Sequence, residues 1–433
     1  MRYIYMNNFR GFAETLVTLK QVNFLVGENS TGKSSFLSLL SLVNKTSFWL
    51  NPEFAVRNEL GLSSFADMVS AWSQDRISFQ LGVVGTDKDK SGRFHLRFSI
   101  HEFVEQDDSP KLFRHFELEG NQLISVIFEK TRTKYKIANL NNDYETEAHA
   151  IEDFMNVVNS TQNDITNLKS FPKEIPSNTP LPIALSLLQS LESGGGAIVS
   201  KNEYKVEIPM AMNVTWIAPI RTKPKRIYDG IQLSYSPEGE HAPMLLRKSL
   251  RSKTGSKPFA DRLSEFGKSS GLFESVVAHS FGKGAKNPFE LLIRFKGAEL
   301  NISNVGYGVS QALPLIVEFL TTLKRRVFAV QQPEVHLHPR AQAALGGLIF
   351  ELAKERGHSF FIETHSDYLI DRYRLSMRLG TDSPESQMLF FMRTSKGNKV
   401  CSLPISSTGL YPSDQPKEFR DFFVREEMKL LDL

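Results

Sequence analysis

Apolar and polar residues follow regular patterns near both ends of the 433-residue chain. Residues 1–45 predict a strand, a hairpin, a second strand, a loop and a helix, and the apolar run at 22–26 has the length of a buried strand. Residues 290–400 predict a longer succession in which strands and helices alternate. This alternation is typical of an α/β domain that is built on a parallel sheet.

The middle of the chain, from about 50 to 290, is less regular. Alternation at ISFQLGVVG and RFHLRFSI predicts strands, whereas the polar stretch at 141–180 and the glycines at 194–196 indicate loops. The simplest organisation is one α/β head formed by residues 1–100 and 290–433. Residues 101–289 are then an inserted mixed α+β lobe with helical and basic segments.

The first apolar strand leads into a phosphate-binding pattern. Gly27–Ser34 matches G-x-x-x-x-G-K-[ST], and a helix with one apolar side follows as far as Val43. The glycines let backbone N–H groups point at phosphate oxygens, Lys33 reaches the β- and γ-phosphates, and the Ser34 hydroxyl binds Mg²⁺. ATP and Mg²⁺ are therefore the predicted cofactors. The residues predicted to hold the nucleotide here are Gly27, Asn29, Ser30, Thr31, Gly32, Lys33, Ser34 and Ser35.

Three segments in the last third of the chain narrow the class of enzyme. Residues 304–311 form a glycine-containing loop before an apolar helix, with Ser310 as the expected N-cap, so that the helix start can attract an anion. The apolar strand at 327–330 ends where P-loop enzymes carry an acid that orders Mg²⁺. Another strand, at 360–362, ends shortly before His365, which can contact a γ-phosphate.

In this order, GENSTGKSS, NVGYGVSQ, QQPEVHLHP and ETHSD resemble the motifs of the ABC-type ATPase heads of the OLD, RecF and SMC-like branch. The opening NNFRGF is similar to the first strand and turn of that branch. WIAPIRTKPKRIYDG and the ending YPSDQPKEFRDFF are similar to segments of stand-alone OLD-like ATPases. The fold implied by the resemblance is an ABC-type P-loop ATPase head assembled from both ends of the chain.

The resemblance also implies a composite active site. Two heads would dimerise head-to-tail around two nucleotides, with Gly27–Ser34 of one subunit opposite Gly308, Ser310 and Gln311 of the other. His365 would sense the γ-phosphate, ATP would join the two heads, and hydrolysis would release them. Gln80 is a candidate for the residue that links the nucleotide to the inserted lobe, with Gln74 and Asp67 as alternatives.

The pattern is broken at the strand that ends at Val330. The family usually carries an acid here, whereas this chain reads Gln331-Gln332-Pro333-Glu334. A glutamine can hold a water by hydrogen bonds but cannot accept its proton. The chain could be a slow or inactive ATPase that assembles on nucleotide, Glu334 could be the base, or residue 331 or 332 could carry an engineered Glu-to-Gln change that traps ATP. We prefer the third interpretation because such a change removes charge but preserves shape.

The catalytic candidates are accordingly Gln331, Gln332, Glu334 and His365, and the candidate metal ligands are Ser34 and Gln331. Composition adds limits on location. Cys401 is the single cysteine, which excludes a disulfide framework. No run of about 18 apolar residues and no secretory signal is present, so we expect a cytoplasmic protein without a membrane partner.

Charge leaves the choice of partner open. The net charge is only +4, but residues 201–260 hold eleven Lys and Arg against five Asp and Glu. Such a region is either a phosphate-facing patch or a solvated surface. The chain carries no nuclease signature and ends about seventy residues after His365. The resemblance therefore implies a sensor or scaffold in anti-phage defence, PARIS-like or Septu-like, that controls a separate effector such as a nuclease. The alternative is a RecF-like repair ATPase that binds DNA directly.

Overall fold

The computed structural model describes residues 2–61, 64–73, 76–130, 132–163, 166–176, 178–192, 213–231, 234–252, 256–284 and 286–421. The chain forms two compact units, and each is described by itself. The first unit comprises Met1–Leu19, Ser30–Met212 and Met392–Val400. The second comprises Lys20–Asn29, Asn213–Phe391 and Cys401–Leu433.

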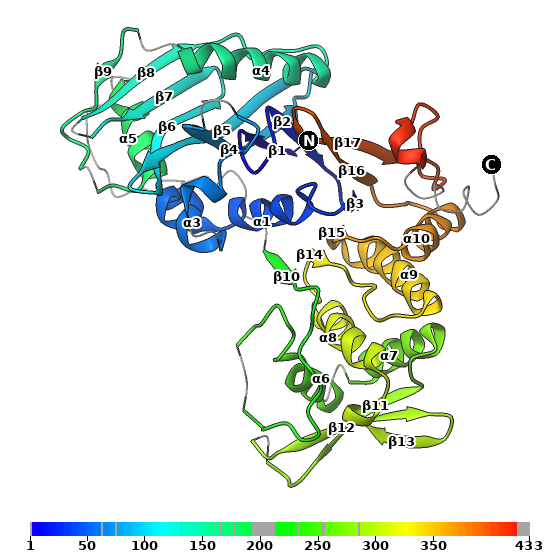
Figure 1. The fold of residues 1–433 in the computed structure, drawn as a ribbon. Helices are drawn as coiled ribbons and strands as arrows, with labels where there is room; N and C mark the ends of the chain where they lie inside the picture. The colour runs from blue at the N-terminus through cyan, green and yellow to red at the C-terminus, as the bar shows by residue number, and fades with distance from the viewer. Residues whose placement is uncertain are drawn as a thin grey trace. The chain divides into compact units, whose positions relative to one another are not determined.

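An eight-stranded antiparallel sheet forms the first unit, in the order β2-β1-β4-β5-β6-β7-β8-β9 (Figure 1). The predicted alternation at ISFQLGVVG and RFHLRFSI is confirmed, since these segments lie in β4 and β5. The strands are β1 (Arg2–Asn7), β2 (Thr15–Leu19), β4 (Ser78–Lys88), β5 (Phe94–Gln106), β6 (Ser109–Glu119), β7 (Gln122–Phe128), β8 (Thr133–Asn139) and β9 (Lys169–Ser170).

Helix α4 (Glu147–Asn163) covers one face of this sheet (Figure 1). Phe154 of α4 packs edge-on against Tyr5 and Phe98, with ring centroids 5.3 Å apart in both pairs. Burying these aromatic rings together supplies much of the apolar area that stabilises the unit. Its other helices are α1 (Lys33–Val43), α2 (Thr46–Leu50), α3 (Pro52–Glu59), the 3₁₀ turn η1 (Phe65–Asp67) and α5 (Leu181–Glu192).

A six-stranded sheet in the order β10-β14-β15-β3-β16-β17 forms the second unit. Its strands are β10 (Val214–Ile217), β14 (Val327–Gln331), β15 (Ser359–Glu363), β3 (Val22–Gly27), β16 (Ser386–Thr394) and β17 (Gly397–Ile405), the last two continuing past the unit border. The first five strands are parallel. Strands β3 and β15 are buried along their whole length, which explains why their sequences are mostly apolar.

This sheet carries its phosphate-type loop directly after β3, one of its inner strands. A parallel sheet with such a loop is the fold of a P-loop ATPase head. Its strands come from residues 22–27 and from residues beyond 213, so the predicted α/β fold assembled from both ends of the chain is confirmed. Among the described residues, no helix has both the length and the apolar character that crossing a bilayer requires.

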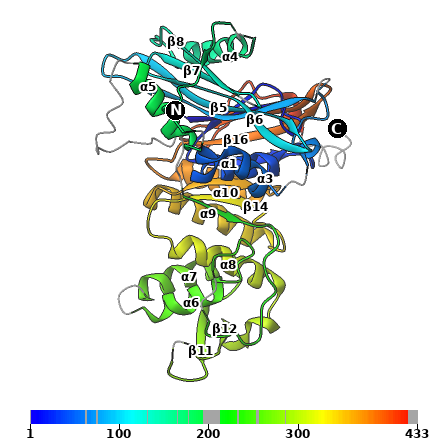
Figure 2. The same cartoon turned by 90° about the vertical axis from the view of Figure 1, so that its left-hand side faces the viewer.

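Among its described residues, the second unit also contains helices α6 to α10 and a small antiparallel sheet. Helices α6 (Ala242–Arg251), α7 (Ser256–Ser270) and α8 (Tyr307–Thr321) lie together with strand β11 (Ser275–Ser280; Figure 2). Helices α9 (Pro339–Arg356) and α10 (Asp367–Leu379) pack on each other. The remaining elements are β11 (Ser275–Ser280), β12 (Phe289–Phe295), β13 (Ala298–Asn301) and the 3₁₀ turn η2 (Ile302–Asn304).

The predicted domain borders differ from those of the two units. The border expected after residue 100 lies inside β5, and the one expected after residue 289 lies inside β12. Residues 213–289, expected in the inserted lobe, belong instead to the second unit. The reason is the pairing of β10 with β14, which brings residues 214–217 into the parallel sheet.

Candidate nucleotide site

The carboxyl ends of β14, β15 and β3 meet at one edge of the parallel sheet. Gln331 lies beside Glu363 in the register of β14 and β15, and Glu363 lies beside Leu25 in the register of β15 and β3. Ligands of open α/β sheets bind outside this edge, because the loops that follow the strands all begin there. The residues just past these strand ends are therefore the candidates for site chemistry.

The loop after β3 is built on unusual backbone angles. Gly27 has φ +143°, and a side chain there would place its Cβ 2.0 Å from the carbonyl oxygen of Phe391. Ser30 has φ +61° and Gly32 has φ +97°. Left-handed residues turn successive N–H groups toward one centre, which is the geometry of an anion-binding loop. The border between the two units falls within this loop, between Asn29 and Ser30.

Helix α1 begins at Lys33, directly after Gly32. The Lys33 side chain and Thr31 are buried, whereas Ser34 is exposed. The carbonyl oxygen of Ser30 accepts a 2.6 Å hydrogen bond from Nη2 of Arg393, which fixes this part of the loop. All the residues predicted here thus lie on one loop and the first turn of one helix. Their contacts with a nucleotide remain predictions.

The site contains a carboxylate that the sequence analysis missed. Glu363 ends β15, is only 5% exposed, and accepts a 3.2 Å hydrogen bond through Oε2 from Nε2 of Gln331. The backbone N–H of Gln332 donates to the carbonyl oxygen of Glu363 at 2.7 Å, although Gln332 has φ +41°. A strained residue at a strand end is held by its surroundings and often marks a functional site. The acidic residue directly before Thr364 and His365 was the available sequence signal.

Glu334 joins two of the loops at this edge. Its Oε2 accepts from the hydroxyl of Thr364 and its Oε1 accepts from the backbone N–H of His365, both at 2.8 Å. His365 is exposed and lies two residues before the start of α10. Glu334 therefore positions the loop that carries His365, with both carboxylate oxygens already engaged.

Arg221 is a second site residue that the sequence analysis missed. It follows β10 by four residues, is 2% exposed, and has its Nη2 3.5 Å from the carbonyl oxygen of Gln331. Its Nε and Nη1 find no hydrogen-bond partner among the described residues. Burial lowers the pKa of Arg221 to about 10, and the charge of Glu334 opposes this shift. The sequence signal for Arg221 was its position just past a short, half-buried strand. Because Arg221 also belongs to a run of basic residues, it was interpreted as part of a surface.

The prediction that Ser310 is the N-cap of α8 is wrong. The helix begins at Tyr307 with Gly306 as its N-cap, and the buried Ser310 donates its hydroxyl to the Tyr307 carbonyl at 2.8 Å. Ser310 is thus inside the first turn and is not the N-cap. Gln311 is also buried, and its amide accepts from the backbone N–H of Arg221 at 3.0 Å and donates to the Arg221 carbonyl at 3.1 Å. Gln311 therefore anchors the Arg221 segment, and its contact with a partner's nucleotide remains a prediction.

The start of α8 packs directly on the loop that follows β14. A side chain at Gly308 would place its Cβ 2.8 Å from the carbonyl oxygen of His336. The ring of Tyr307 meets that of His336 edge-on at 4.8 Å. Ala312 of α8 belongs to an apolar cluster with Leu337. The predicted loop and the Gln331–Glu334 segment are therefore neighbours in one unit.

The basic region does not form a single exposed patch. Arg221 is buried, and so is Arg247, which donates to the carbonyl oxygens of Asn287 and Gly284 at 2.9 and 3.1 Å. Lys223, Lys225 and Arg226 are exposed. Arg221 and Arg247 are thus enclosed by protein, whereas Lys223, Lys225 and Arg226 are accessible to an anionic partner.

The candidates for linking the nucleotide to the other lobe lie in the first unit. Gln80 is a buried residue of β4 that accepts a 3.3 Å hydrogen bond from the hydroxyl of Tyr5. Asp67 lies in η1, and Gln74 lies outside the described residues. None of the three has a contact that tests the predicted role.

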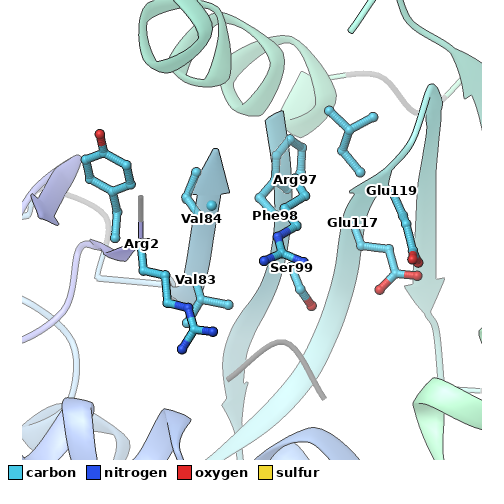
Figure 3. Close-up of a pocket in the computed structure, with 11 residues that line it drawn as sticks. Arg2, Val83, Val84, Arg97, Phe98, Ser99, Glu117 and Glu119 are labelled. Atoms are coloured by element: carbon cyan, nitrogen blue, oxygen red, sulfur yellow. The ribbon is translucent and has the colours of Figure 1, made fainter. Parts of the chain in front are cut away.

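A shallow cavity of about 90 Å³ lies on β1, β4, β5 and β6 of the first unit (Figure 3). Arg2 and Arg97 contribute positive charges and Glu117 and Glu119 contribute negative charges to its lining (Figure 3). None of the predicted site residues lines it. Among the described residues, no group of three or more His, Cys, Asp or Glu side chains converges as a metal cage would require.

Comparison with known families agrees with this geometry. Residues 1–181 match the model of an AAA ATPase domain, and residues 206–371 match a model described as an AAA domain, putative AbiEii toxin, of a type IV toxin–antitoxin system. The chain carries an ATPase domain of this broad type. Each match spans less than half of the chain. No curated protein matches the sequence closely enough to count as a relative.

Several solved structures are distantly similar in backbone. An Smc head bound to the C-terminal winged-helix domain of ScpA is 13% identical, with a TM-score of 0.43 and coverage of 93% of this chain and 97% of that one. The SMC head domain from Thermotoga maritima is 12% identical, with a TM-score of 0.39 and coverage of 93% and 99%. The Smc head derived from Pyrococcus furiosus is 12% identical, with a TM-score of 0.41 and coverage of 99% and 100%.

Proposed function

We propose that this chain is an ABC-type ATPase head that binds ATP and Mg²⁺ on the loop Gly27–Ser34. The observation that carries the proposal is the loop itself, which leaves the buried strand β3 through left-handed residues and enters α1 at Lys33. Backbone N–H groups at such a helix start, together with a lysine in the first turn, are suited to a polyphosphate.

The oxygen donors near this loop fit Mg²⁺. This ion prefers oxygen ligands, keeps several waters and needs only one or two protein groups besides the phosphates. Glu363 offers a buried carboxylate at the strand ends and Gln331 an amide beside it, and the sequence motif adds the hydroxyl of Ser34 to these donors. A bound Mg²⁺ would neutralise phosphate charge. The part of Ser34 in this set rests on its place in the sequence motif.

We propose further that two copies of the chain close head-to-tail around two nucleotides. The helix start at Gly306–Gly308 supports this step, because the first N–H groups of α8 have no intrahelical acceptor and are suited to an anion. The close packing of Gly308 on the His336 backbone holds this helix start in place. Gly308 would then meet the γ-phosphate of the partner's nucleotide through its backbone.

In this proposal the dimer acts as the sensor or scaffold of an anti-phage defence system and controls a separate effector, a nuclease. The resemblance to stand-alone OLD-like ATPases supports this reading, as does the match of residues 206–371 to a domain described as a putative AbiEii toxin. A pull-down from cells that carry the native neighbouring genes, with and without ATP, tests it. Recovery of no nuclease in either condition would contradict the effector hypothesis.

Nucleotide binding and dimerisation are tested together. We expect the chain to bind a fluorescent ATP analogue and to sediment as a dimer only when nucleotide is present. Lys33→Ala should lose both properties because it removes the phosphate-binding cation. Lys45→Ala is the matched control, since this exposed lysine lies just beyond α1 and outside the phosphate-binding motif, in an ion pair with the half-buried Glu59. Equal nucleotide affinity of the two variants would refute the proposed site.

Direct DNA binding is the second candidate, and the exposed cluster Lys223, Lys225 and Arg226 favours it. Phosphate contacts by such residues make affinity fall steeply with salt. Charge reversal at all three positions should therefore weaken DNA binding and flatten its salt dependence. If DNA binding is unchanged in that variant, the cluster has no DNA-binding role.

A further inference from the structure

A cavity of about 170 Å³ lies among α6, α8, β12 and the loop that precedes α6. Every residue in its lining falls between positions 222 and 317, so the cavity belongs wholly to the second unit and shares no residue with the loop Gly27–Ser34. Its apolar wall contains Leu246 of α6, Leu291 of β12, and Leu313 and Val317 of α8, all of them buried. Such a wall is suited to an apolar group of a ligand.

The size of the cavity limits what it can hold. An apolar cavity of about 150 Å³ is large enough for benzene, whereas drug-sized ligands occupy pockets of about 300–1,000 Å³. A cavity of about 170 Å³ therefore accommodates one aromatic ring or one branched aliphatic chain. The rest of the ligand would lie at the mouth.

An aromatic pair forms one side of the cavity. The rings of Tyr228 and Phe289 stack with their centroids 5.5 Å apart, and the two backbones exchange hydrogen bonds of 2.8 and 3.0 Å. The Tyr228 hydroxyl accepts from the backbone N–H of Lys225 at 3.0 Å. Burial raises the pKa of Tyr228, so this hydroxyl keeps its proton and can donate it to a ligand.

Helix α8 contributes a backbone acceptor with spare capacity. Pro314 lies inside this helix and has no N–H, so the carbonyl oxygen of Ser310 lacks the donor that residue 314 would otherwise supply. Ser310 and Pro314 both line the cavity. Gly239 fixes the position of the proline ring, because a Cβ at Gly239 would lie only 2.6 Å from the Cβ of Pro314. The helix wall can therefore accept a hydrogen bond from a ligand.

Charges of both signs line the mouth of the cavity. Lys223 and Lys225 are positive, and both are exposed. Asp229 and Glu240 are negative and also exposed. None of these four side chains forms an ion pair with a described residue, so they do not neutralise one another. A ligand with a single charge would use only half of this set, whereas a ligand that carries both charges would use all of it.

We propose that this cavity binds a free α-amino acid whose side chain is apolar and as large as that of leucine or phenylalanine. The side chain would fill the cavity, and the carboxylate would lie against Lys223 and Lys225. The ammonium group would lie against Asp229 and Glu240, within reach of the spare carbonyl of α8. This inference goes beyond the proposed function and does not depend on nucleotide binding.

Isothermal titration calorimetry of the full chain without nucleotide tests the class of ligand. The probes are L-leucine, L-phenylalanine, 3-phenylpropanoate, which lacks the ammonium group, and phenethylamine, which lacks the carboxylate. We expect L-phenylalanine or L-leucine to bind, and each phenylalanine analogue to bind about 10-fold or more weakly than L-phenylalanine, because hydrogen bonds to a charged group are lost. L-alanine is the control, since it carries both charges but leaves the cavity unfilled. The proposal is overturned if neither large amino acid binds, or if L-alanine or either analogue binds as tightly as they do.

Two variants locate the site. Val317→Phe should abolish binding, because the added ring occupies the cavity. The double variant Lys223→Gln with Lys225→Gln changes only exposed side chains, so it remains informative if Val317→Phe fails to fold. It should weaken binding of L-phenylalanine about 10-fold or more and leave binding of phenethylamine unchanged. Lys248→Gln is the matched control, since this lysine of α6 is exposed but lies outside the lining. Equal affinity of the double variant and this control for L-phenylalanine would overturn the assignment.

Discussion

Replacing Arg221 by methionine should make the ligand-free protein more stable. Arg221 is 2% exposed and its Nε and Nη1 lack partners among the described residues. Its remaining contact, 3.5 Å from Nη2 to the Gln331 carbonyl oxygen, is too long to contribute much. Methionine fills a similar volume without a charge that must leave water.

The magnitude follows from the pKa of Arg221. Burial lowers that pKa from its ordinary value to about 10 despite the opposing charge of Glu334. Each pKa unit corresponds to about 1.4 kcal/mol, so retaining the charge costs the folded state about 3 kcal/mol. Below about pH 10 the guanidinium is protonated in both the folded and unfolded chains, and the cost is fully present. This cost disappears only as the pH rises above about 10 toward the ordinary pKa of an arginine.

Urea unfolding at pH 7.5 measures the effect. We expect Arg221→Met to raise the unfolding free energy by up to about 3 kcal/mol, since replacing a buried charge by an apolar group is often stabilising. Arg247→Met is the matched control, because Arg247 is equally buried but donates to the carbonyls of Asn287 and Gly284. Leaving those acceptors unpaired should cost about 1–3 kcal/mol. If both variants lose stability to the same extent, the reasoning about Arg221 is refuted.

Three further outcomes are expected. Gly32→Ala should abolish ATP-analogue binding and lower the unfolding free energy by roughly 2–4 kcal/mol, because its Cβ would lie 2.3 Å from Phe12 at φ +97°. Gly120→Ala, with open space around it, should lower the unfolding free energy by only about 1–2 kcal/mol. Equal losses of stability in thermal melts would contradict this difference. Burial holds the pKa of His101 well below 6.5, so just below that pH only the unfolded chain binds a proton at this residue. The unfolding free energy should therefore fall by up to about 1.4 kcal/mol for each pH unit below 6.5. In urea titrations at pH 8 and 5.5, His101→Gln should reduce this fall, and an unchanged fall would assign it to other groups. Glu334→Gln should lower the unfolding free energy by about 1–3 kcal/mol, because its amide cannot accept all the bonds that the carboxylate accepts; an unchanged urea midpoint would argue against that role.

Local sequence patterns predicted the elements around the site well. The strands expected at 22–26, 327–330 and 360–362 are confirmed as β3, β14 and β15, each extended by one or two residues. These strands are buried in a parallel sheet and are therefore mostly apolar, so they can be predicted without tertiary information. The loop Gly27–Ser34 could also be predicted from local sequence, because all the residues of its motif are contiguous.

Contacts that arise from the pairing of distant strands could not be predicted from local sequence. Glu363 and Gln331 are 32 positions apart, and only the pairing of β14 with β15 makes them neighbours. Arg221 looked like part of a basic surface because nothing local places β10 beside β14. Ser310 was a reasonable N-cap by propensity, but its hydroxyl bonds back to Tyr307 inside a helix that starts one turn earlier.

The border between the two units is crossed five times by the chain, at residues 19/20, 29/30, 212/213, 391/392 and 400/401. Neither unit can therefore be produced as one continuous fragment. Val22 of β3 pairs with Phe360 and Ser386, which leave the ribosome long after it. Domains usually fold as units during synthesis, starting from the N-terminus. The sheet around β3 cannot be completed until both of its neighbouring strands have been synthesised. We expect prematurely terminated chains to remain unable to bind nucleotide, which makes binding a check on complete synthesis.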